Sequence, residues 1–88
     1  MFIKQNESTM KTWKIIDGQL TKEFSFNDFV SAVNFVNAIA KVAEAHNHHP
    51  DILIHSYKLV KVMLFTHDAK AITNKDHQLA EAIDKLEI

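Results

Sequence analysis

The stretch W-K-I-I-D-G-Q-L-T-K-E-F-S-F-N-D-F, residues 13–29, decides the fold. Within it Asp17-Gly18 predicts a two-residue β-turn, because both central positions need a positive φ and this glycine is the only one in the chain. The second half of the stretch places its bulky residues on one face, with a lysine among them: Leu20, Lys22, Phe24 and Phe26. A β-hairpin with strands over residues 13–16 and 19–26 is therefore expected.

From residue 27 onward the apolar residues recur with the period of a helix. Asn27 is expected to cap this helix, since its side-chain oxygen can accept a hydrogen bond from an unpaired backbone N–H. The helix is predicted over residues 28–45. Its apolar stripe comprises Phe29, Ala32, Val33, Val36, Ala40 and Ala43. The stripe is widened beyond the usual ~100° face by Phe35, Ile39 and Val42. So wide a face predicts either a second partner, such as another subunit, or apolar surface left exposed.

The second half of the chain again predicts two strands and a helix. Pro50 ends the first helix, because the residue before a proline avoids the α region. Strands are expected over residues 52–55 and 57–66. The longer strand is apolar on both faces, which predicts a central position in the sheet. One of its faces comprises Tyr57, Leu59, Met63 and Phe65, and the other comprises Val60, Val62 and Leu64.

The last helix is expected to begin at Thr73, where T-N-K-D resembles a capping box with Asp76 in place of the usual glutamate. Its buried stripe comprises Leu79, Ala80, Ile83 and Leu86. The order β-β-α-β-β-α predicts an α+β fold, in which a four-stranded antiparallel sheet carries both helices on one face.

Length and composition limit the possible functions. The 88 residues predict one domain over residues 1–88, of which residues 1–11 form a flexible start. A formal charge of -1 argues against a direct nucleic-acid or membrane-surface partner. The absence of cysteine excludes a disulfide scaffold, a thiolate zinc site and a thiol nucleophile. No signal peptide or membrane span is visible in the sequence, so a cytoplasmic protein is expected.

Six histidines stand out in so short a chain. His48, His49 and His67 lie where predicted elements end and loops open, which is a position suited to catalytic side chains. Imidazole gives and takes protons near neutral pH, so these three residues are candidates for general acid–base catalysis. The other histidines are expected at the surface: His46, His55 and His77.

Two alternatives to acid–base catalysis remain open from the residues alone. His46, His48 and His49, joined by His55 or His67, could supply imidazole ligands to zinc or another divalent ion. Adjacent histidines in extended backbone point apart, however, and no HExxH motif is present. In the second alternative, all six are ordinary surface histidines.

A set of motifs follows in a fixed order along the chain. The segment A-E-A-H-N-H-H-P over residues 43–50 is followed by Tyr57, Val60, L-F-T-H over residues 64–67 and T-N-K-D over residues 73–76. Trp13 and F-S-F-N-D-F over residues 24–29 precede them. With these motifs the chain resembles the pterin-4a-carbinolamine dehydratase family, also called 4a-hydroxytetrahydrobiopterin dehydratase, over residues 13–86.

The resemblance implies a fold and a reaction. Members of the family have a four-stranded antiparallel sheet with helices on one side and assemble into homodimers or homotetramers. They are hydro-lyases that remove water from the 4a-carbinolamine of a tetrahydropterin and so form the quinonoid dihydropterin. This reaction serves tetrahydrobiopterin recycling after pterin-dependent hydroxylases. A small-molecule pterin substrate is implied, with no metal and no organic cofactor.

The resemblance also assigns roles to residues. His48 and His67 form the acid–base pair, and His49 completes the catalytic set by binding and orienting the pterin. Pro50 fixes the backbone after these histidines. The remaining site residues are Thr66, Asp68, Asp76 and Glu44. Thr66 and Asp68 line the pocket, Asp76 either caps the last helix or contacts the substrate, and Glu44 hydrogen-bonds into the site or the subunit interface.

Three features depart from the family's pattern. Lys70-Ala71-Ile72 stands where a Gly-Gly-Leu loop is usual, which restricts φ and brings a positive charge near the pocket. One extra residue between Pro50 and Tyr57 predicts a bulge or a longer turn. The family's N-terminal helix is expected to be missing. The altered loop favours a second hypothesis, in which the scaffold serves as a non-catalytic binding, assembly or transcriptional cofactor protein.

Overall fold

The helices and strands of the described residues follow one another in the predicted order. A computed structural model describes residues 10–86 of the chain. Its elements are β1 (Lys14–Ile16), β2 (Gln19–Ser25), α1 (Phe29–His46), β3 (Asp51–His55), β4 (Leu59–Leu64) and α2 (Asn74–Asp84). The expected lack of the family's N-terminal helix and most of the expected flexible start concern residues 1–9, which lie outside the described residues.

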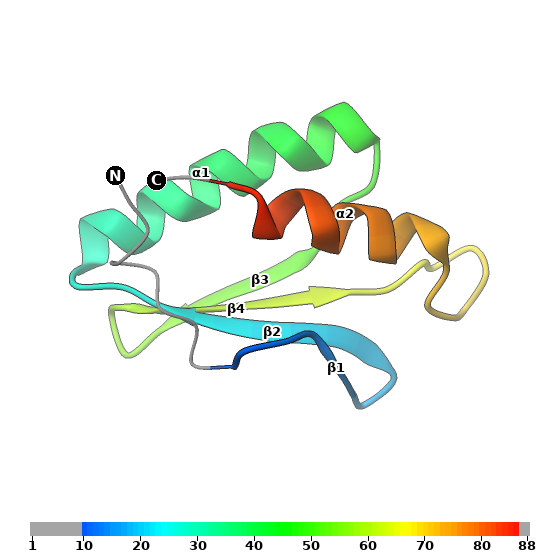
Figure 1. Cartoon of the computed structure of the whole chain (residues 1–88), viewed down its shortest axis with the longest axis horizontal. Coiled ribbons are helices and arrows are strands. Elements are labelled where there is room, and N and C mark those ends of the chain that lie inside the picture. Colours follow the sequence, from blue (N-terminus) through cyan, green and yellow to red (C-terminus); the bar gives the residue numbers. More distant parts are fainter. Residues whose placement is uncertain (1–9, 87–88) are drawn as a thin grey trace.

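The strands form one antiparallel sheet in the order β1-β2-β4-β3. β4 therefore lies between β2 and β3, as its two apolar faces predict. Both helices cover the same face of the sheet, and within residues 10–86 the other face carries no helix (Figure 1). The α+β arrangement predicted from the element order is confirmed.

The β1–β2 turn has the geometry that its sequence predicts. Asp17 and Gly18 adopt φ angles of 53° and 78°. No atom of the described residues lies within 4 Å of the position where a Cβ on Gly18 would stand, its chain neighbours aside. Glycine is thus favoured here by its backbone conformation and not by crowding.

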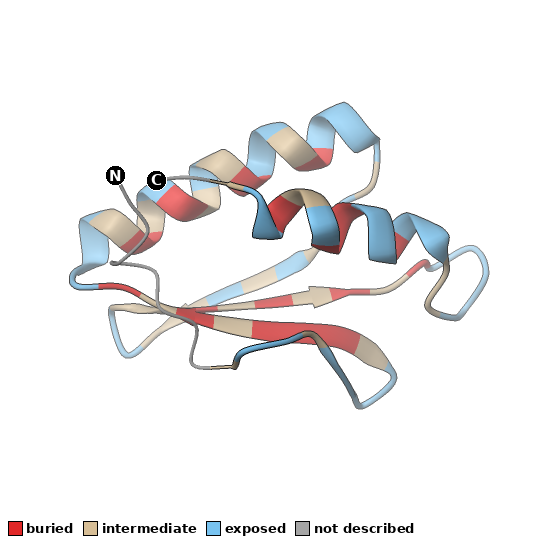
Figure 2. Cartoon of the chain, viewed as in Figure 1, coloured by how far each residue is buried: buried red, intermediate tan, exposed pale blue. Residues whose placement is uncertain are grey.

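The core lies between the sheet and the two helices, where the buried residues of both layers face each other (Figure 2). Phe35 of α1 is fully buried and packs against Phe24 and Phe26, with ring centroids 4.8 and 5.0 Å apart. The expected apolar stripe of α1 is wrong at two positions, since Phe29 and Ala40 are exposed. The helix turns so that Ala32, Phe35, Ile39 and Ala43 face the sheet.

The residue that caps α1 differs from the predicted one. Asp28, not Asn27, takes the extended N-cap conformation, and its Oδ1 accepts a 2.8 Å hydrogen bond from the Ser31 backbone N–H. Hydrogen bonding from Ser31, chiefly from its backbone N–H, holds the pKa of Asp28 below its ordinary value. Asn and Asp are both favoured at N-caps, so residue type does not distinguish Asn27 from Asp28. The helix begins one residue later than predicted, and the Asp28 carboxylate therefore accepts the hydrogen bond from its first turn.

β4 is shorter than the predicted strand over residues 57–66. Its ladder with β3 runs without interruption from His55↔Leu59 to Asp51↔Met63, so β3 contains no bulge. Ser56 and Tyr57 both have positive φ and form the turn between the strands. Tyr57 is therefore an exposed turn residue and not part of a strand face. Of the two outcomes predicted for the extra residue after Pro50, the bulge is absent from β3.

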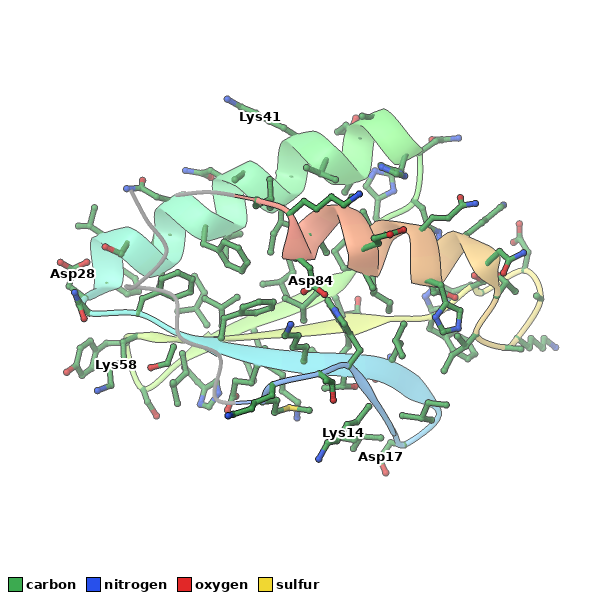
Figure 3. All side chains as sticks on the ribbon, in the orientation of Figure 1. Lys14, Asp17, Asp28, Lys41, Lys58 and Asp84 are labelled. Carbon is green, nitrogen blue, oxygen red and sulfur yellow. The ribbon has the colours of Figure 1, made fainter. Side chains whose placement is uncertain are left out.

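Lys22, the polar residue on the apolar face of β2, is buried in a small polar cluster. Its Nζ lies 2.8 Å from Asp84 Oδ1 and 5.1 Å from the centre of the Phe24 ring. Trp13 Nε1 donates to the same carboxylate at 3.1 Å. Asp84 points from α2 toward the sheet, whereas Lys41 extends from α1 into solvent (Figure 3). The cluster connects the end of α2 to β2 and to Trp13, the residue before β1.

Across the described part of the chain, neither helix has the length and hydropathy that crossing a bilayer requires.

Candidate active site

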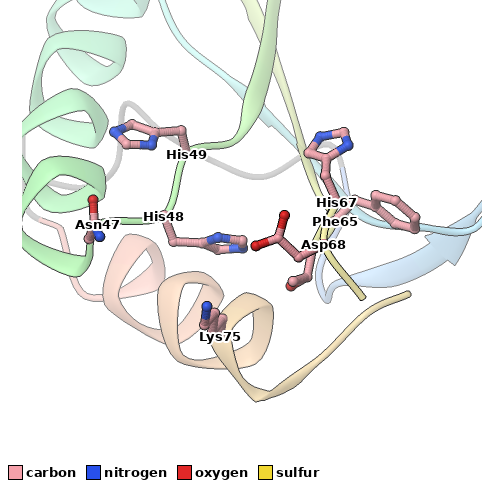
Figure 4. A pocket seen from close by; sticks show the side chains of 8 residues that line it. Asn47, His48, His49, Phe65, His67, Asp68 and Lys75 are labelled. Carbon is pink, nitrogen blue, oxygen red and sulfur yellow. The ribbon is translucent and has the colours of Figure 1, made fainter. Parts of the chain in front are cut away.

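A cleft of about 310 Å³ opens at the end of the molecule where α1 ends, β4 ends and α2 begins. This volume is at the lower end of the range for small-molecule sites. The lining residues are Asn47, His48, His49, Phe65, Thr66, His67, Asp68 and Lys75 (Figure 4). They come from three segments that are distant in sequence and that the fold brings together.

The end of α1 places the first histidines. Asn47 takes the left-handed conformation, and its N–H binds the carbonyl oxygens of Ala43 and Glu44. The N–H of His48 also bonds to the Ala43 carbonyl, at 3.1 Å. This left-handed cap reverses the chain and aims it toward β3. Pro50 follows as the last residue before β3.

His48 is the most enclosed of the pocket histidines. Its side chain is only 12% exposed, and its Nε2 lies 2.5 Å from Oδ1 of Asp76. Asp76 belongs to the first turn of α2 and is fully buried. A buried carboxylate on one ring nitrogen fixes both the orientation and the tautomer of an imidazole.

Asp76 also completes the predicted capping box. Its Oδ2 accepts the Thr73 backbone N–H at 2.9 Å, and the Thr73 hydroxyl accepts the Lys75 N–H at 3.2 Å. Burial by itself raises the pKa of Asp76. The hydrogen bonds from His48, Thr73 and Thr66, together with the charge on His48, outweigh burial and hold this pKa below its ordinary value.

His49 lies nearer to solvent than His48. Its Nε2 is 2.6 Å from Oε2 of Glu44, and both side chains are more than half exposed. An ion pair at such a site stabilises the fold little, because water and salt screen it. The contact nevertheless gives the ring of His49 a preferred direction, back toward α1 and opposite to that of the His48 ring (Figure 4).

His67 follows β4 in a short loop. Its ring meets Phe65 edge-on, with the ring centroids 5.3 Å apart. Thr66 and Ala71 close the loop through a pair of backbone hydrogen bonds of 3.1 and 3.3 Å. Lys70, inside this loop, has a φ of 55°. Lys70 therefore has the left-handed backbone conformation that usually favours glycine.

The predicted site residues divide into three groups. The cleft is lined by His48, His49, Thr66, His67 and Asp68. Asp76, which is buried, and Glu44, which is exposed, are outside the lining, and each contacts a histidine of the cleft. Pro50 is half-buried and is not part of the lining.

Sequence reasoning missed three lining residues: Asn47, Phe65 and Lys75. Asn47 and Phe65 each stand one residue before a residue that was singled out, and Lys75 directly precedes Asp76. Their proximity in sequence to the motif residues was the available signal.

The other histidines are placed away from the cleft lining. His46 and His77 are exposed, as predicted. His55 is only half-buried, and its Nε2 bonds to Oε2 of Glu23 across the helix-free face of the sheet. Over residues 10–86, no group of three or more His, Cys, Asp or Glu side chains lies close enough to hold a metal ion.

The geometry combines two imidazoles of different surroundings in one open cleft. His48 is held from behind by a buried carboxylate, while His67 stands at the exposed end of a loop. Such a pair can carry out a proton abstraction and a proton donation on the same bound molecule.

Comparison with known proteins relates this chain to one family. The family model for pterin 4 alpha carbinolamine dehydratase matches residues 3–86. A protein of Sulfurisphaera tokodaii, provisionally named a pterin-4-alpha-carbinolamine dehydratase, is 44% identical over 84 residues, which cover 96% of this chain and 89% of that protein. A protein of Herpetosiphon aurantiacus with the same provisional name is 47% identical over 84% of this chain and 76% of that protein.

Two solved structures share the fold. A transcriptional coactivator/pterin dehydratase from Brucella melitensis superposes with a TM-score of 0.75 at 32% identity, over 85% of this chain and 81% of that one. A pterin dehydratase-like RuBisCO assembly factor of the alpha-carboxysome gives a TM-score of 0.68 at 21% identity, over 83% of this chain and 86% of that one.

Proposed function

The chain belongs to the pterin 4 alpha carbinolamine dehydratase family, and from that premise we propose that it converts a 4a-hydroxytetrahydropterin into the quinonoid dihydropterin. The observation that carries this proposal is the pairing of a carboxylate-backed imidazole, His48, with a second imidazole, His67, in one cleft. The reaction would take place in the cytoplasm and would recycle the oxidised pterin of a hydroxylase.

The elimination needs two proton transfers. The N5–H bond of the substrate breaks, its electrons form the C4a=N5 double bond, and the C4a–O bond breaks. The hydroxyl leaves as water after it receives a proton. The substrate has the composition of the quinonoid dihydropterin plus water, so no oxidant or reductant is needed, and a base and an acid on the two sides of the C4a–N5 bond are sufficient.

We assign the base to His48 and the acid to His67. Asp76 contacts Nε2 of His48 and stabilises the imidazolium that forms when the other nitrogen takes the N5 proton. His67, exposed at the loop, would enter in its protonated form and donate to the leaving hydroxyl. His49 and Asp68, which line the same cleft, are proposed to orient the pterin, and solvent resets both histidines after each turnover.

A coupled assay tests the proposal. A pterin-dependent hydroxylase generates the carbinolamine in situ, and ultraviolet absorbance follows the quinonoid dihydropterin. The wild-type protein should accelerate its appearance, and His48→Ala combined with His67→Ala should lower the rate by about 10²–10⁴-fold, the usual contribution of general acid–base groups. His46→Ala combined with His77→Ala is the matched control, because both side chains are exposed outside the cleft. A wild-type rate equal to that in buffer would refute the dehydratase.

A second candidate is a binding or assembly role on the same scaffold. It is favoured by the exposed apolar residues in the first turn of α1, Phe29 and Val30, which are 54% and 66% exposed. The Brucella relative is also described as a transcriptional coactivator. A binding role would survive the double histidine substitution and would be lost in Phe29→Ser combined with Val30→Ser, so the two variants separate the functions.

A further inference from the structure

Two threonine hydroxyls lie behind the cleft, on the side of Asp76 away from His48. Thr66 Oγ1 is 2.7 Å from Asp76 Oδ2 and 2.8 Å from Thr73 Oγ1. Thr66 is buried, and it reaches Asp76 from the segment after β4, whereas Thr73 and Asp76 both belong to the start of α2. The contact of Thr66 with Asp76 is therefore a tertiary one that the capping box does not require.

These hydrogen bonds form a series from the Lys75 backbone N–H to the Asp76 carboxylate, and the groups at its two ends determine which atom donates in each bond. The Lys75 backbone N–H can only donate, so it donates to the Thr73 hydroxyl oxygen. The ionised carboxylate of Asp76 can only accept, so the single hydroxyl proton of Thr66 is donated to it. Thr73 must then donate its own hydroxyl proton to Thr66. Each hydroxyl thus has one defined orientation.

The other end of the same carboxylate sets the state of His48. Oδ1 of Asp76 is also an acceptor only, so Nε2 of His48 carries a hydrogen. No hydrogen bond among residues 10–86 ends on His48 Nδ1, and within the same range no buried side-chain nitrogen or oxygen lacks a partner. Nδ1 is consequently open to the cleft, where it is an acceptor in the neutral ring.

We propose that Thr66 and Thr73 are positioning residues that lock Asp76 in one rotamer and, through it, hold His48 as the Nε2–H tautomer with Nδ1 facing the substrate. Thr66 then contributes to the wall of the cleft with its carbon atoms and has no hydroxyl hydrogen left for a ligand. The structural part of this inference stands independently, and its effect on turnover rests on the proposed dehydratase function.

The proposal differs from a purely structural role for Thr66. A structural residue would affect only the stability of the loop or of α2. Loss of a positioning residue would instead change which ring nitrogen of His48 carries the hydrogen. Without Thr66 the carboxylate of Asp76 can move away from Nε2, and the ring then also populates the Nδ1–H form. The ring nitrogens of His48 therefore provide a readout that stability alone does not move.

The test compares Thr66→Val, which keeps the shape and removes the hydroxyl, with Thr66→Ser, which keeps the hydroxyl. Nitrogen-15 NMR of the histidine rings, recorded over a pH series that reaches the neutral ring, reports the tautomer of His48. Wild-type protein and Thr66→Ser should show the Nε2–H form. Thr66→Val should show a mixture with the Nδ1–H form, and Asp76→Asn serves as the positive control.

Turnover provides the second readout. Thr66→Val should lower kcat by about tenfold or more with KM little changed, since a hydrogen bond to a charged group is worth at least that factor. Thr66→Ser should retain kcat within about threefold of wild type on the same scale. Should Thr66→Val not fold, Thr66→Ala is compared with Thr66→Ser by the same measurements.

Two results would overturn the proposal. An Nδ1–H tautomer in the wild-type protein contradicts the hydrogen-bond directions without any variant. A pure Nε2–H form in Thr66→Val contradicts the positioning role. A protein that shows the predicted tautomers but no dehydratase activity would refute the proposed function and leave the positioning role in place.

Discussion

At the scale of single residues, Asp76 contributes to two features that involve different parts of the sequence, the N-terminus of α2 and the orientation of His48. It caps α2 through the Thr73 backbone N–H, and it holds His48 from behind. Burial costs this carboxylate its hydration, and its hydrogen-bond donors compensate for that loss. The start of α2 and the orientation of a candidate catalytic side chain therefore depend on the same group.

Asp76→Asn should make the stability of the protein less sensitive to acid. The pKa of Asp76 is lowered in the folded state despite burial. Its stabilising contribution is thus fully present above the ordinary carboxyl pKa near 3.8 and is lost as the pH falls through the lower folded value. At neutral pH the variant should be less stable by about 1–3 kcal/mol, because a buried donor is left facing the amide NH₂.

Urea unfolding of both proteins at pH 7 and at about pH 3 measures this difference. Asp51→Asn is the matched control, since Asp51 is exposed at the start of β3. An equal loss of stability on acidification in wild type and Asp76→Asn would contradict the prediction.

Lys70→Gly should stabilise the protein. Lys70 adopts a φ of 55°, which costs a residue with a Cβ about 1–2 kcal/mol. Glycine removes this cost but gains more freedom in the unfolded chain, so a net gain of about 0.5–1 kcal/mol is expected. Ala71→Gly is the control, because Ala71 has no positive φ and the substitution should destabilise. Chemical denaturation decides the sign, and a loss of stability in Lys70→Gly would refute the argument.

At the scale of elements, the ends of the helices carry most of the specific chemistry. α1 ends in the left-handed conformation of Asn47, four residues from β3, and this cap places His48. α2 begins at a capping box that holds the same histidine. The two helices therefore meet the cleft with opposite ends, the C-terminus of one and the N-terminus of the other.

The N-cap of α1 makes a testable pair of neighbours. Asp28→Ala should lower the melting temperature, because the Ser31 N–H loses its side-chain acceptor. Asn27→Ala should have a smaller effect, since Asn27 is exposed and lies before the cap. Thermal unfolding by circular dichroism compares the two, and the reverse ranking would favour Asn27 as the true cap.

At the scale of the whole molecule, the sheet has one helix-covered face, and α1 is only partly covered by its own chain (Figure 1). Apolar residues remain exposed in the first turn of α1 and on the strands, including Phe29, Val30 and Leu53. The sequence predicted for this helix either a second partner or apolar surface left exposed, and the exposure of these residues is compatible with both.

We expect the protein to form a homodimer or homotetramer at micromolar concentration. Burying the exposed apolar side chains of α1 against a second copy would supply the driving force. Multi-angle light scattering measures the mass directly, and Val30→Asp should shift the protein toward monomer. Lys41→Asp, a charge change on the solvent side of α1, is the control (Figure 3). A monomeric wild-type protein would contradict the prediction.

The sequence by itself determined the order and type of the elements, the Asp17-Gly18 turn and the capping box at Thr73. These features depend on residues within a few positions of one another, so local rules for turns, caps and periodicity are sufficient. The H-H-P and T-H motifs predict acid–base chemistry at the cleft, and this chemistry stays a prediction.

Only the tertiary structure determined which side chains from distant parts of the sequence contact one another. The carboxylate behind His48 lies 28 positions away in sequence, and Thr66 reaches that carboxylate from 10 positions away. The buried side of α1 and the burial of Lys22 beside Asp84 were likewise set by packing against other elements. Periodicity identifies the apolar face of a helix, but where this face is wide it does not determine which of its residues are buried. Hydrogen-bond partners that are distant in sequence are determined only by the packing of the helices on the sheet.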